Sequence, residues 1–244
     1  MRADITYQYD VVDSTNDEAK RLLSARRRAK HGTIITASEQ TNGRGRLGKS
    51  FASPGGDSIY VSFILKPPED PAEQRITAFA AVAVCLAIEK TTSYRPGIKW
   101  INDIYLEGKK ICGILAESVP SAVVLGIGIN INQSQGSFPD ELRESAGSLI
   151  MNAEERARLF ECLQEEVFRC MAVAERPGTV EAVHLMDEYR TRSVLLKKGI
   201  LLSQGNTTIP AFCEDLANDG ALIVRFIDGS VEELRSGDIT VQLV

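Results

Sequence analysis

The stretch that separates the possible folds of this chain is Glu39-Gln40-Thr41-Asn42-Gly43-Arg44-Gly45-Arg46-Leu47-Gly48-Lys49-Ser50. Its letters match both the dinucleotide fingerprint Gly-x-Gly-x-x-Gly and the P-loop pattern Gly-x-x-x-x-Gly-Lys-Ser. Each motif requires an apolar strand that runs directly into the glycines and a helix that begins directly after them. Five polar residues precede Gly43 instead, and the Pro-Gly-Gly sequence at 54–56 cannot sustain a helix afterwards. The context argues against a doubly wound parallel sheet, although a P-loop stays open as an alternative.

A third interpretation of this stretch uses its charges. Arg44, Arg46 and Lys49 put three cations on a backbone that the glycines make flexible. Such a loop repels itself when empty and folds over an anion when phosphates supply the opposite charge. A solvated basic surface loop is the plainer alternative, and the rest of the sequence has to decide between the two.

The composition is that of an ordinary globular chain. It has 244 residues, 43% of them hydrophobic and 25% charged, which suits one large domain and a small one. The net charge of -5 lacks the basic excess of a dedicated nucleic-acid-binding protein. No signal-peptide core and no apolar run of membrane-spanning length are present in the sequence.

The cysteines and histidines narrow the chemistry further. Five cysteines without a C-x-x-C pair favour buried thiols in a reducing, cytoplasmic compartment. The two histidines, His31 and His184, lie far apart and outside any motif. This pattern argues against a histidine-based metal site or a Ser-His-Asp triad.

Apolar periodicity predicts an α+β domain followed by a small β domain. Helices are expected at residues 17–23, 72–90, 154–174 and 179–189, and strands at 33–37, 59–65, 98–101 and 122–131. Residues 104–117 predict a hairpin that turns at Gly108. After about Ser193, turn signals separate short strands. We therefore predict a mixed β-sheet with helices on one side for residues 1–192 and a small antiparallel barrel for residues 193–244.

A second polar cluster falls on β-rich segments. Lys99, Asn102 and Asp103 surround the end of a short strand, and Lys110 follows on the returning strand. Lysines on apolar strands are costly unless their charge meets an anion. A structural ion pair between Asp103 and Lys110 is the plainer explanation. Asn130 interrupts an apolar run with an amide that needs partners if it is buried, and such an amide suits the edge of a nucleotide base.

Taken in order, these segments resemble the catalytic domain of biotin protein ligases. The matching residues are Asp13-Ser14-Thr15-Asn16, Gln40 with Gly43-Arg44-Gly45-Arg46-x-Gly48, Phe51-x-Ser53-Pro54, Lys99-Trp100-x-Asn102-Asp103, Lys110-x-x-Gly113-Ile114-Leu115-x-Glu117 and Gly126-x-Gly128-x-Asn130. Six motifs in the family's order are specific, and the resemblance runs from about Tyr7 to the C-terminus. It implies a class II synthetase-like mixed sheet followed by a small SH3-like β-barrel.

The resemblance also implies a two-step, ATP-dependent ligase reaction in the cytoplasm. The biotin carboxylate attacks the α-phosphate of ATP, with Mg²⁺ as cofactor, and biotinyl-5'-AMP and pyrophosphate form. A lysine of the biotin carboxyl carrier domain of a biotin-dependent carboxylase, such as acetyl-CoA carboxylase, then displaces AMP. Only about six residues precede the matched region, too few for a helix-turn-helix. We therefore expect no nucleic-acid partner. We also expect no membrane partner, and a monomer or homodimer.

The family's residue roles carry over to the matching positions as expectations. The implied biotin-binding set is Ser14, Thr15, Asn16, Gln40, Arg44, Gly45, Arg46, Lys110 and Gly113. The implied ATP-binding set is Arg46, Phe51, Lys99, Asn102, Asp103 and Asn130. Lys110, Arg46 and Arg44 are the expected catalytic residues, and Asp103 is the expected Mg²⁺ contact. Fixed cations would remove the repulsion between a carboxylate and a triphosphate and stabilise charge that develops on the phosphate.

The sequence departs from the family pattern at two positions, and three alternative functions can be weighed against a biotin ligase. Ile101 stands where the family commonly has Pro. Phe51 stands where the family commonly has Trp, and its smaller ring should stack less strongly on adenine. A lipoate–protein ligase is the alternative with a related fold and chemistry, but the glycine-arginine loop and the uncharged set Ser14, Asn16 and Gln40 favour biotin. A P-loop nucleotide-binding protein is the remote alternative. A pure binding module would leave both cationic clusters unexplained.

Overall fold

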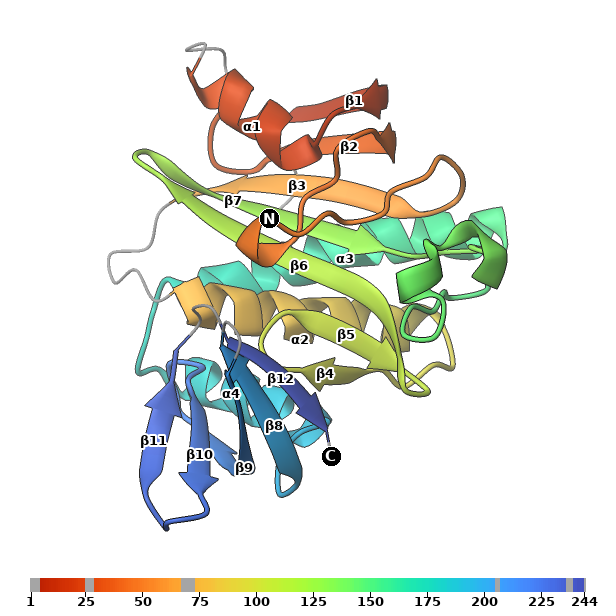
Figure 1. The fold of residues 1–244 in the computed structure, drawn as a ribbon. Helices are drawn as coiled ribbons and strands as arrows, with labels where there is room; N and C mark the ends of the chain where they lie inside the picture. The colour runs from red at the N-terminus through yellow and green to blue at the C-terminus, as the bar shows by residue number, and fades with distance from the viewer. Residues whose placement is uncertain (1–4, 25–28, 67–72, 205–206, 236–238, 244) are drawn as a thin grey trace.

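Two β-sheets dominate the computed structural model, which describes residues 5–24, 29–66, 73–204, 207–235 and 239–243 (Figure 1). The larger sheet has seven strands in the order β1-β2-β3-β7-β6-β5-β4. Their bounds are β1 (Ile5–Val12), β2 (Thr33–Gln40), β3 (Ile59–Leu65), β4 (Gly97–Lys99), β5 (Asp103–Leu106), β6 (Lys109–Val119) and β7 (Ala122–Ile129). β1 and β2 run parallel, and the other neighbouring strands run antiparallel. The predicted mixed sheet is therefore confirmed, and a doubly wound parallel sheet is excluded.

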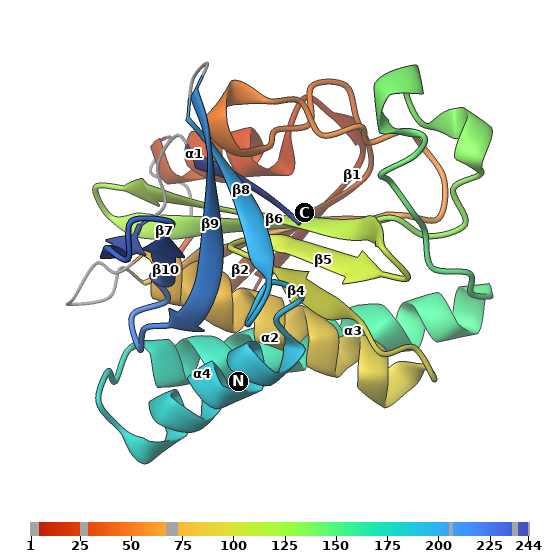
Figure 2. The same ribbon diagram turned by 60° about the horizontal axis from the view of Figure 1, so that its bottom comes forward.

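Helices cover both faces of the large sheet. α2 (Glu73–Thr91) and α3 (Ala153–Ala174) pack on the face that carries Phe63, whereas α1 (Thr15–Ser24) packs Leu22 on the face that carries Ile64. Successive residues of a strand point to opposite faces, and Figure 2 shows α1 across the sheet from α2 and α3. The prediction of helices on one side is wrong for α1, because an amphipathic pattern predicts burial but not which sheet face is covered.

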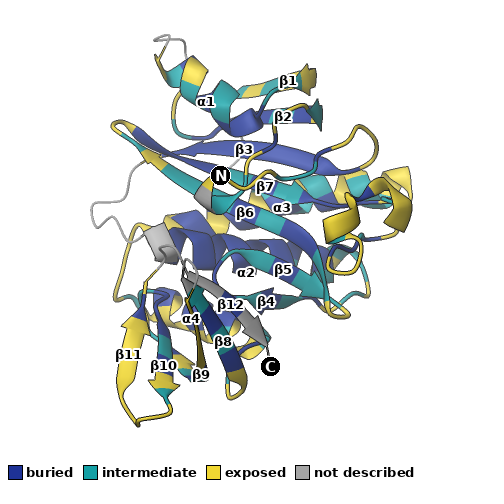
Figure 3. Ribbon diagram, in the orientation of Figure 1, coloured by how far each residue is buried: buried dark blue, intermediate teal, exposed yellow. Residues whose placement is uncertain are grey.

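The central helix α2 is buried nearly all round, as its dark colour in Figure 3 shows. Its alanine-rich stretch allows close packing between the sheet and α3. α3 begins with a capping box, in which Asn152 accepts from the backbone N–H of Glu155 and Glu155 accepts from that of Asn152. These two helices cover one face of the sheet and leave the opposite face, next to α1, uncovered by them.

The hairpin of β5 and β6 fixes the position of the second polar cluster. Its two-residue turn has Glu107 at φ 50° and Gly108 at φ 81°, the left-handed values of a type I′ turn. The turn predicted at Gly108 is confirmed. In the resulting register, Asp103 pairs with Gly113, and a shift after Ile104 brings Tyr105 opposite Lys110.

The C-terminal segment forms a second, smaller sheet after α4 (Val180–Arg192). Its strands are β8 (Gly199–Gln204), β9 (Thr207–Leu216), β10 (Leu222–Phe226), β11 (Val231–Leu234) and β12 (Ile239–Leu243). They run antiparallel in the order β11-β10-β9-β8-β12, and in the described part of the chain the outer strands β11 and β12 are not paired with each other. The small antiparallel sheet is confirmed, but a closed SH3-like barrel is not.

The two sheets are in direct contact. The buried indole Nε1 of Trp100 donates to the carbonyl of Gly220 at 2.9 Å, and one hydrophobic core includes residues of both sheets. The domain boundary at 192/193 stays a prediction. Within the described residues, no helix combines the length and the apolar character needed to cross a membrane.

Candidate active site

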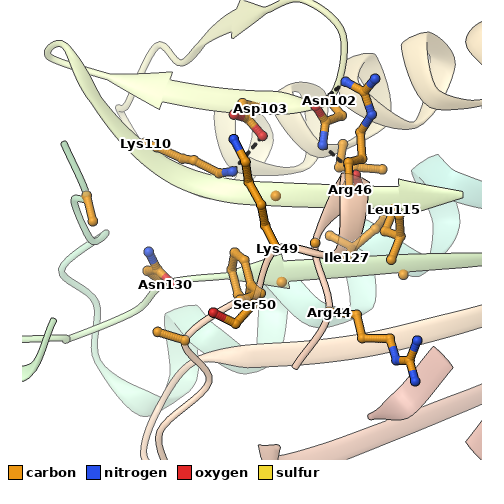
Figure 4. A pocket seen from close by; sticks show the side chains of 18 of the residues that line it. Arg44, Arg46, Lys49, Ser50, Asn102, Asp103, Lys110, Leu115, Ile127 and Asn130 are labelled. Carbon is orange, nitrogen blue, oxygen red and sulfur yellow. Dashed lines mark hydrogen bonds and ion pairs between the residues drawn. The ribbon is translucent and has the colours of Figure 1, made fainter. Parts of the chain in front are cut away.

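One pocket, of about 330 Å³, collects every residue of the implied biotin-binding and ATP-binding sets. It lies between the residue 41–52 loop, the start of α1 and the strands β5, β6 and β7 (Figure 4). The lining includes Ser14, Thr15, Asn16, Gln40, Arg44, Gly45, Arg46, Phe51, Lys99, Asn102, Asp103, Lys110, Gly113 and Asn130. Val241 of β12 also reaches this lining, so the second sheet contributes to the same pocket.

Glycines make the floor of the pocket. Gly113 of β6 and Gly128 of β7 are register partners, and a Cβ atom on either would lie 3.0 Å or 2.6 Å from the ring of Phe51. A Cβ atom on Gly126 would meet the side-chain amide of Asn16. Glycine within a strand marks a close approach, and here it lets an aromatic ring and an amide lie directly on the sheet. Gly126 and Gly128 belong to a family motif in which the sequence assigned them no role. The structure gives them one, which is to allow this close approach to the sheet.

Uncharged polar side chains form one end of the pocket. Gln40 Oε1 accepts from the backbone N–H of Thr15 at 2.8 Å and from its hydroxyl at 3.0 Å. The hydroxyl of Ser62 lies 2.8 Å from that of Thr15 and 2.6 Å from Asn16 Oδ1. Asn16 Nδ2 donates to Glu117 Oε2 at 2.8 Å. Because Thr15, Asn16 and Ser62 are buried, these bonds hold their side chains in fixed orientations. Sequence reasoning missed Ser62 and gave Glu117 no role.

Charged side chains form the other end. Lys110 Nζ lies 2.7 Å from Asp103 Oδ1, and both side chains are partly exposed. Arg46 donates to Asn102 Oδ1 at 3.4 Å, while Asn102 Nδ2 donates to the carbonyl of Ile114 at 2.8 Å. Figure 4 shows Lys49, from the loop, extending toward the Asp103–Lys110 pair. The predicted structural ion pair between Asp103 and Lys110 thus exists, and it lies inside the pocket.

Burial changes the proton affinities of this charged end. Desolvation lowers the pKa of Arg46 and of Lys99, and the nearby carboxylate of Asp103 opposes the shift in both. Lys99 Nζ lies 5.3 Å from the ring centroid of Tyr105. Burial, followed by the charge of Asp103, raises the pKa of that tyrosine to about 12. The pocket therefore holds these cations at a desolvation cost that a bound anion would offset.

The glycine-arginine loop is not a P-loop. β2 ends at Gln40, and the loop contains only a three-residue 3₁₀ turn (Arg46–Gly48) before β3. The N–H of Gly45 donates to the carbonyl of Lys49, and the N–H of Lys49 donates to that of Arg46. A P-loop needs such N–H groups directed at a phosphate. Here they close the loop on itself, with an antiparallel bridge between Arg44 and Ser50.

Asn130 and Asp103 are the remaining predicted contacts. Asn130 is buried, and its Nδ2 donates to the carbonyl of Gly147 at 3.0 Å. Asp103 is the single acidic residue that lines the pocket among the described residues. No group of three or more His, Cys, Asp or Glu side chains able to hold a metal ion occurs in the described ranges. A metal bound here would need most of its ligands from a nucleotide and from water.

Comparisons with known proteins agree with this geometry. A biotin--[acetyl-CoA-carboxylase] ligase from Mycobacterium tuberculosis is 27% identical over 243 residues, 95% of this chain and 88% of that protein. The bifunctional ligase/repressor BirA from Bacillus subtilis is 41% identical over 155 residues, 61% of this chain and 47% of that protein. The chain thus matches about half the length of this Bacillus relative.

A solved structure and a family model complete the comparison. Biotin protein ligase from Aquifex aeolicus in complex with biotin and ATP superposes with a TM-score of 0.82 at 24% identity, covering 99% of this chain and 100% of that one. It shows a shared fold. The model of the biotin/lipoate A/B protein ligase family matches residues 9–134, more than half of the sequence. The chain therefore belongs to the biotin/lipoate A/B protein ligase family.

Proposed function

We propose that this chain is an ATP-dependent ligase that activates biotin as biotinyl-5'-AMP and transfers it to a lysine of a biotin carboxyl carrier domain. The observation that carries the proposal is one pocket with an uncharged polar end and a cationic end on a glycine floor. Such a pocket suits a ligand with a neutral polar head and a carboxylate tail beside a nucleotide. The ligase relative from Mycobacterium tuberculosis, matched over most of both chains, supports the same activity.

The uncharged end fits the ureido ring of biotin. That ring offers N–H donors and a carbonyl acceptor, which hydroxyl and amide groups can satisfy without any charge. Ser14, Thr15 and Gln40 line this end, and the bonds among Thr15, Gln40 and Ser62 fix its geometry. Preformed partners reduce the entropy that ligand binding costs.

The cationic end fits the adenylation step. An oxygen of the biotin carboxylate forms a bond to the α-phosphorus of ATP, and the bond from that phosphorus to the bridging oxygen of pyrophosphate breaks. Lys110 would hold the carboxylate, and Arg46 and Lys99 would face the phosphates. These cations reduce the repulsion between two anions and stabilise charge that develops during attack. In the second step, the acceptor lysine amine attacks the biotinyl carbonyl, and AMP leaves.

Asp103 would provide the protein contact of Mg²⁺. This ion commonly binds one or two carboxylates together with substrate phosphates, so a single pocket carboxylate is compatible with it. When bound, Mg²⁺ would neutralise phosphate charge. The ion pair with Lys110, at 2.7 Å, fixes the orientation of the Asp103 carboxylate.

Phe51 and Asn130 would recognise the adenine base. The ring of Phe51 lies on Gly113 and Gly128 and offers a flat apolar surface. Because Nδ2 of Asn130 is committed to the carbonyl of Gly147, its Oδ1 is the atom suited to accept from the adenine amino group.

Intact-mass spectrometry of a carrier domain tests the proposal. The carrier, ATP and either biotin or lipoate would be incubated with the enzyme, and a carrier without its acceptor lysine would serve as the control. We expect one biotinyl group on the intact carrier and none on the control. Lipoyl transfer in place of biotinyl transfer would establish the lipoate ligase alternative, and no transfer with either acid would refute the adenylation proposal.

A further inference from the structure

The side chain of Arg44 does not join the other cations of the pocket. Its Nε lies 2.7 Å from Asp17 Oδ2, on the first turn of α1, and Figure 4 shows it extending away from Lys110 and Asp103. Asp17 is only 16% exposed, whereas the Arg44 side chain is 49% exposed. The loop is therefore joined to α1 by an ion pair between Arg44 and the partly buried carboxylate of Asp17.

Asp17 is itself held in place by the residues around it. Lys20 Nζ lies 3.4 Å from Asp17 and 2.7 Å from Glu117 of β6. Glu117 in turn accepts from the buried amide of Asn16. Charges of alternating sign thus form a chain from the loop to strand β6, through Arg44, Asp17, Lys20 and Glu117. Such a network is more effective than an isolated surface pair, because each ion limits the freedom of the next.

The internal bonding of the loop extends the effect of this anchor. Arg44 bridges to Ser50, and the N–H of Phe51 donates to the carbonyl of Gly43 at 2.8 Å. Residues 43–51 therefore form a small closed unit. Fixing Arg44 against α1 fixes the whole unit, including the ring of Phe51 on the glycine floor.

We propose that Asp17 is a positioning residue, which holds residues 43–50 over the pocket through Arg44. The inference rests on the proposed ligase function, because a held loop matters most for a reactive adenylate. A mixed anhydride hydrolyses when water reaches it, so a loop fixed over the pocket would retain the intermediate until the acceptor arrives. Asp17 touches no substrate in this role and acts through Arg44 alone.

The experiment compares Asp17→Asn with Glu18→Gln. Both residues are acidic and lie in the first turn of α1, so both interact with its helix dipole. Glu18, however, pairs with Arg21 at 2.7 Å and not with the loop. Hydrogen exchange of residues 43–50 would be measured in the protein without ligand. The rate of AMP release would be measured with biotin and ATP but no acceptor.

Asp17→Asn should speed both amide exchange in the loop and acceptor-independent AMP release about threefold to fivefold, the range expected of a partly exposed ion pair. Glu18→Gln should leave both rates near those of the unmodified protein. Arg44→Gln should reproduce the effect of Asp17→Asn, and the double variant should add nothing further, because both changes remove one interaction.

Two contrary results would overturn the inference. Loop exchange unchanged by Asp17→Asn would show that the ion pair does not hold the loop. Equal effects of Asp17→Asn and Glu18→Gln would assign the effect to the helix dipole. If the unmodified protein released no pyrophosphate with biotin and ATP, no adenylate would form and the proposed function would fail. The exchange measurement would still decide whether Asp17 holds the loop, because it needs no ligand.

Discussion

Replacing Lys110 by alanine is the change that most directly tests the chemistry of the cationic end. Lys110 Nζ lies 2.7 Å from Asp103, and its side chain is 32% exposed. Two unit charges about 4 Å apart interact by roughly 4 kcal/mol at an effective dielectric constant of about 20. Screening of a side chain that is one-third exposed reduces this to about 2 to 3 kcal/mol. Since each tenfold in rate is about 1.4 kcal/mol, adenylate formation should fall by about 100-fold.

Lys49→Ala separates this mechanism from a P-loop mechanism. Lys49 lines the pocket but is exposed, so its loss should reduce the rate by less than about tenfold. Lys109→Ala is the matched control, because Lys109 precedes Lys110 on β6 and does not belong to the pocket lining. Pyrophosphate release with biotin and ATP would be followed for all three variants, and circular dichroism would confirm their folding. An inactive Lys49 variant beside an active Lys110 variant would refute the roles assigned to the two lysines.

Three further predictions concern the glycine floor and the buried lysine. Gly128→Ala puts a methyl group 2.6 Å from the ring of Phe51, so the rate of adenylation should fall by about tenfold, as expected for overpacking. Adding Phe51→Ala should recover part of this loss. If the effects of the two substitutions simply added, the contact between them would be contradicted. Phe51→Ala alone should weaken ATP binding by about 1 kcal/mol and leave biotin binding nearly unchanged in calorimetry; the reverse pattern would mean that Phe51 serves biotin. Lys99→Met should weaken ATP binding by about tenfold or more, as loss of a charge-assisted bond does, yet stabilise the empty protein. Burial lowers the folded-state pKa of Lys99 below its ordinary value of 10.5, so its charge costs stability at neutral pH, and this cost fades as pH rises from the lowered pKa toward 10.5. Urea unfolding at neutral pH would measure the gain, and a less stable variant would count against the sign of this argument.

The sequence predicted the kind of sheet better than the arrangement of layers around it. Polar residues before Gly43 and the Pro-Gly-Gly segment after the loop are local facts, and they were enough to reject a doubly wound fold. The side of the sheet that α1 covers is a non-local fact, since Ala19 and Leu22 would be buried on either face. Closure of the C-terminal barrel likewise depends on strand pairing between segments far apart in sequence, which no turn signal encodes.

For the site, too, local features were predictable from the sequence and non-local ones were not. Its lining was predicted because six motifs keep a family order, and the structure collects in one pocket the motif residues that were given a binding role. The partners of the lining residues were not predictable. Asn16 meets Glu117 across 101 positions of sequence, and Asp17 meets Arg44 only because β2 returns the chain beside the start of α1. Ser62 belongs to no motif and is a small hydroxyl side chain in a mostly apolar strand, so nothing in the sequence indicated that it belongs to the site.

The two arginines of the loop therefore have different physical tasks, although they stand two positions apart. Burial lowers the pKa of Arg46, so its charge is held in the pocket at a cost until an anion arrives, which is how a preorganised site favours a developing negative charge. Arg44 points away from the other pocket cations and forms an ion pair with Asp17. The uncharged end built around Thr15 and Gln40 carries no comparable desolvation cost, so it selects its ligand by hydrogen-bond geometry rather than by charge. A ligand with a neutral ring at one end and a carboxylate at the other meets both requirements, and a second anion beside the carboxylate offsets the cost of burying Arg46 and Lys99.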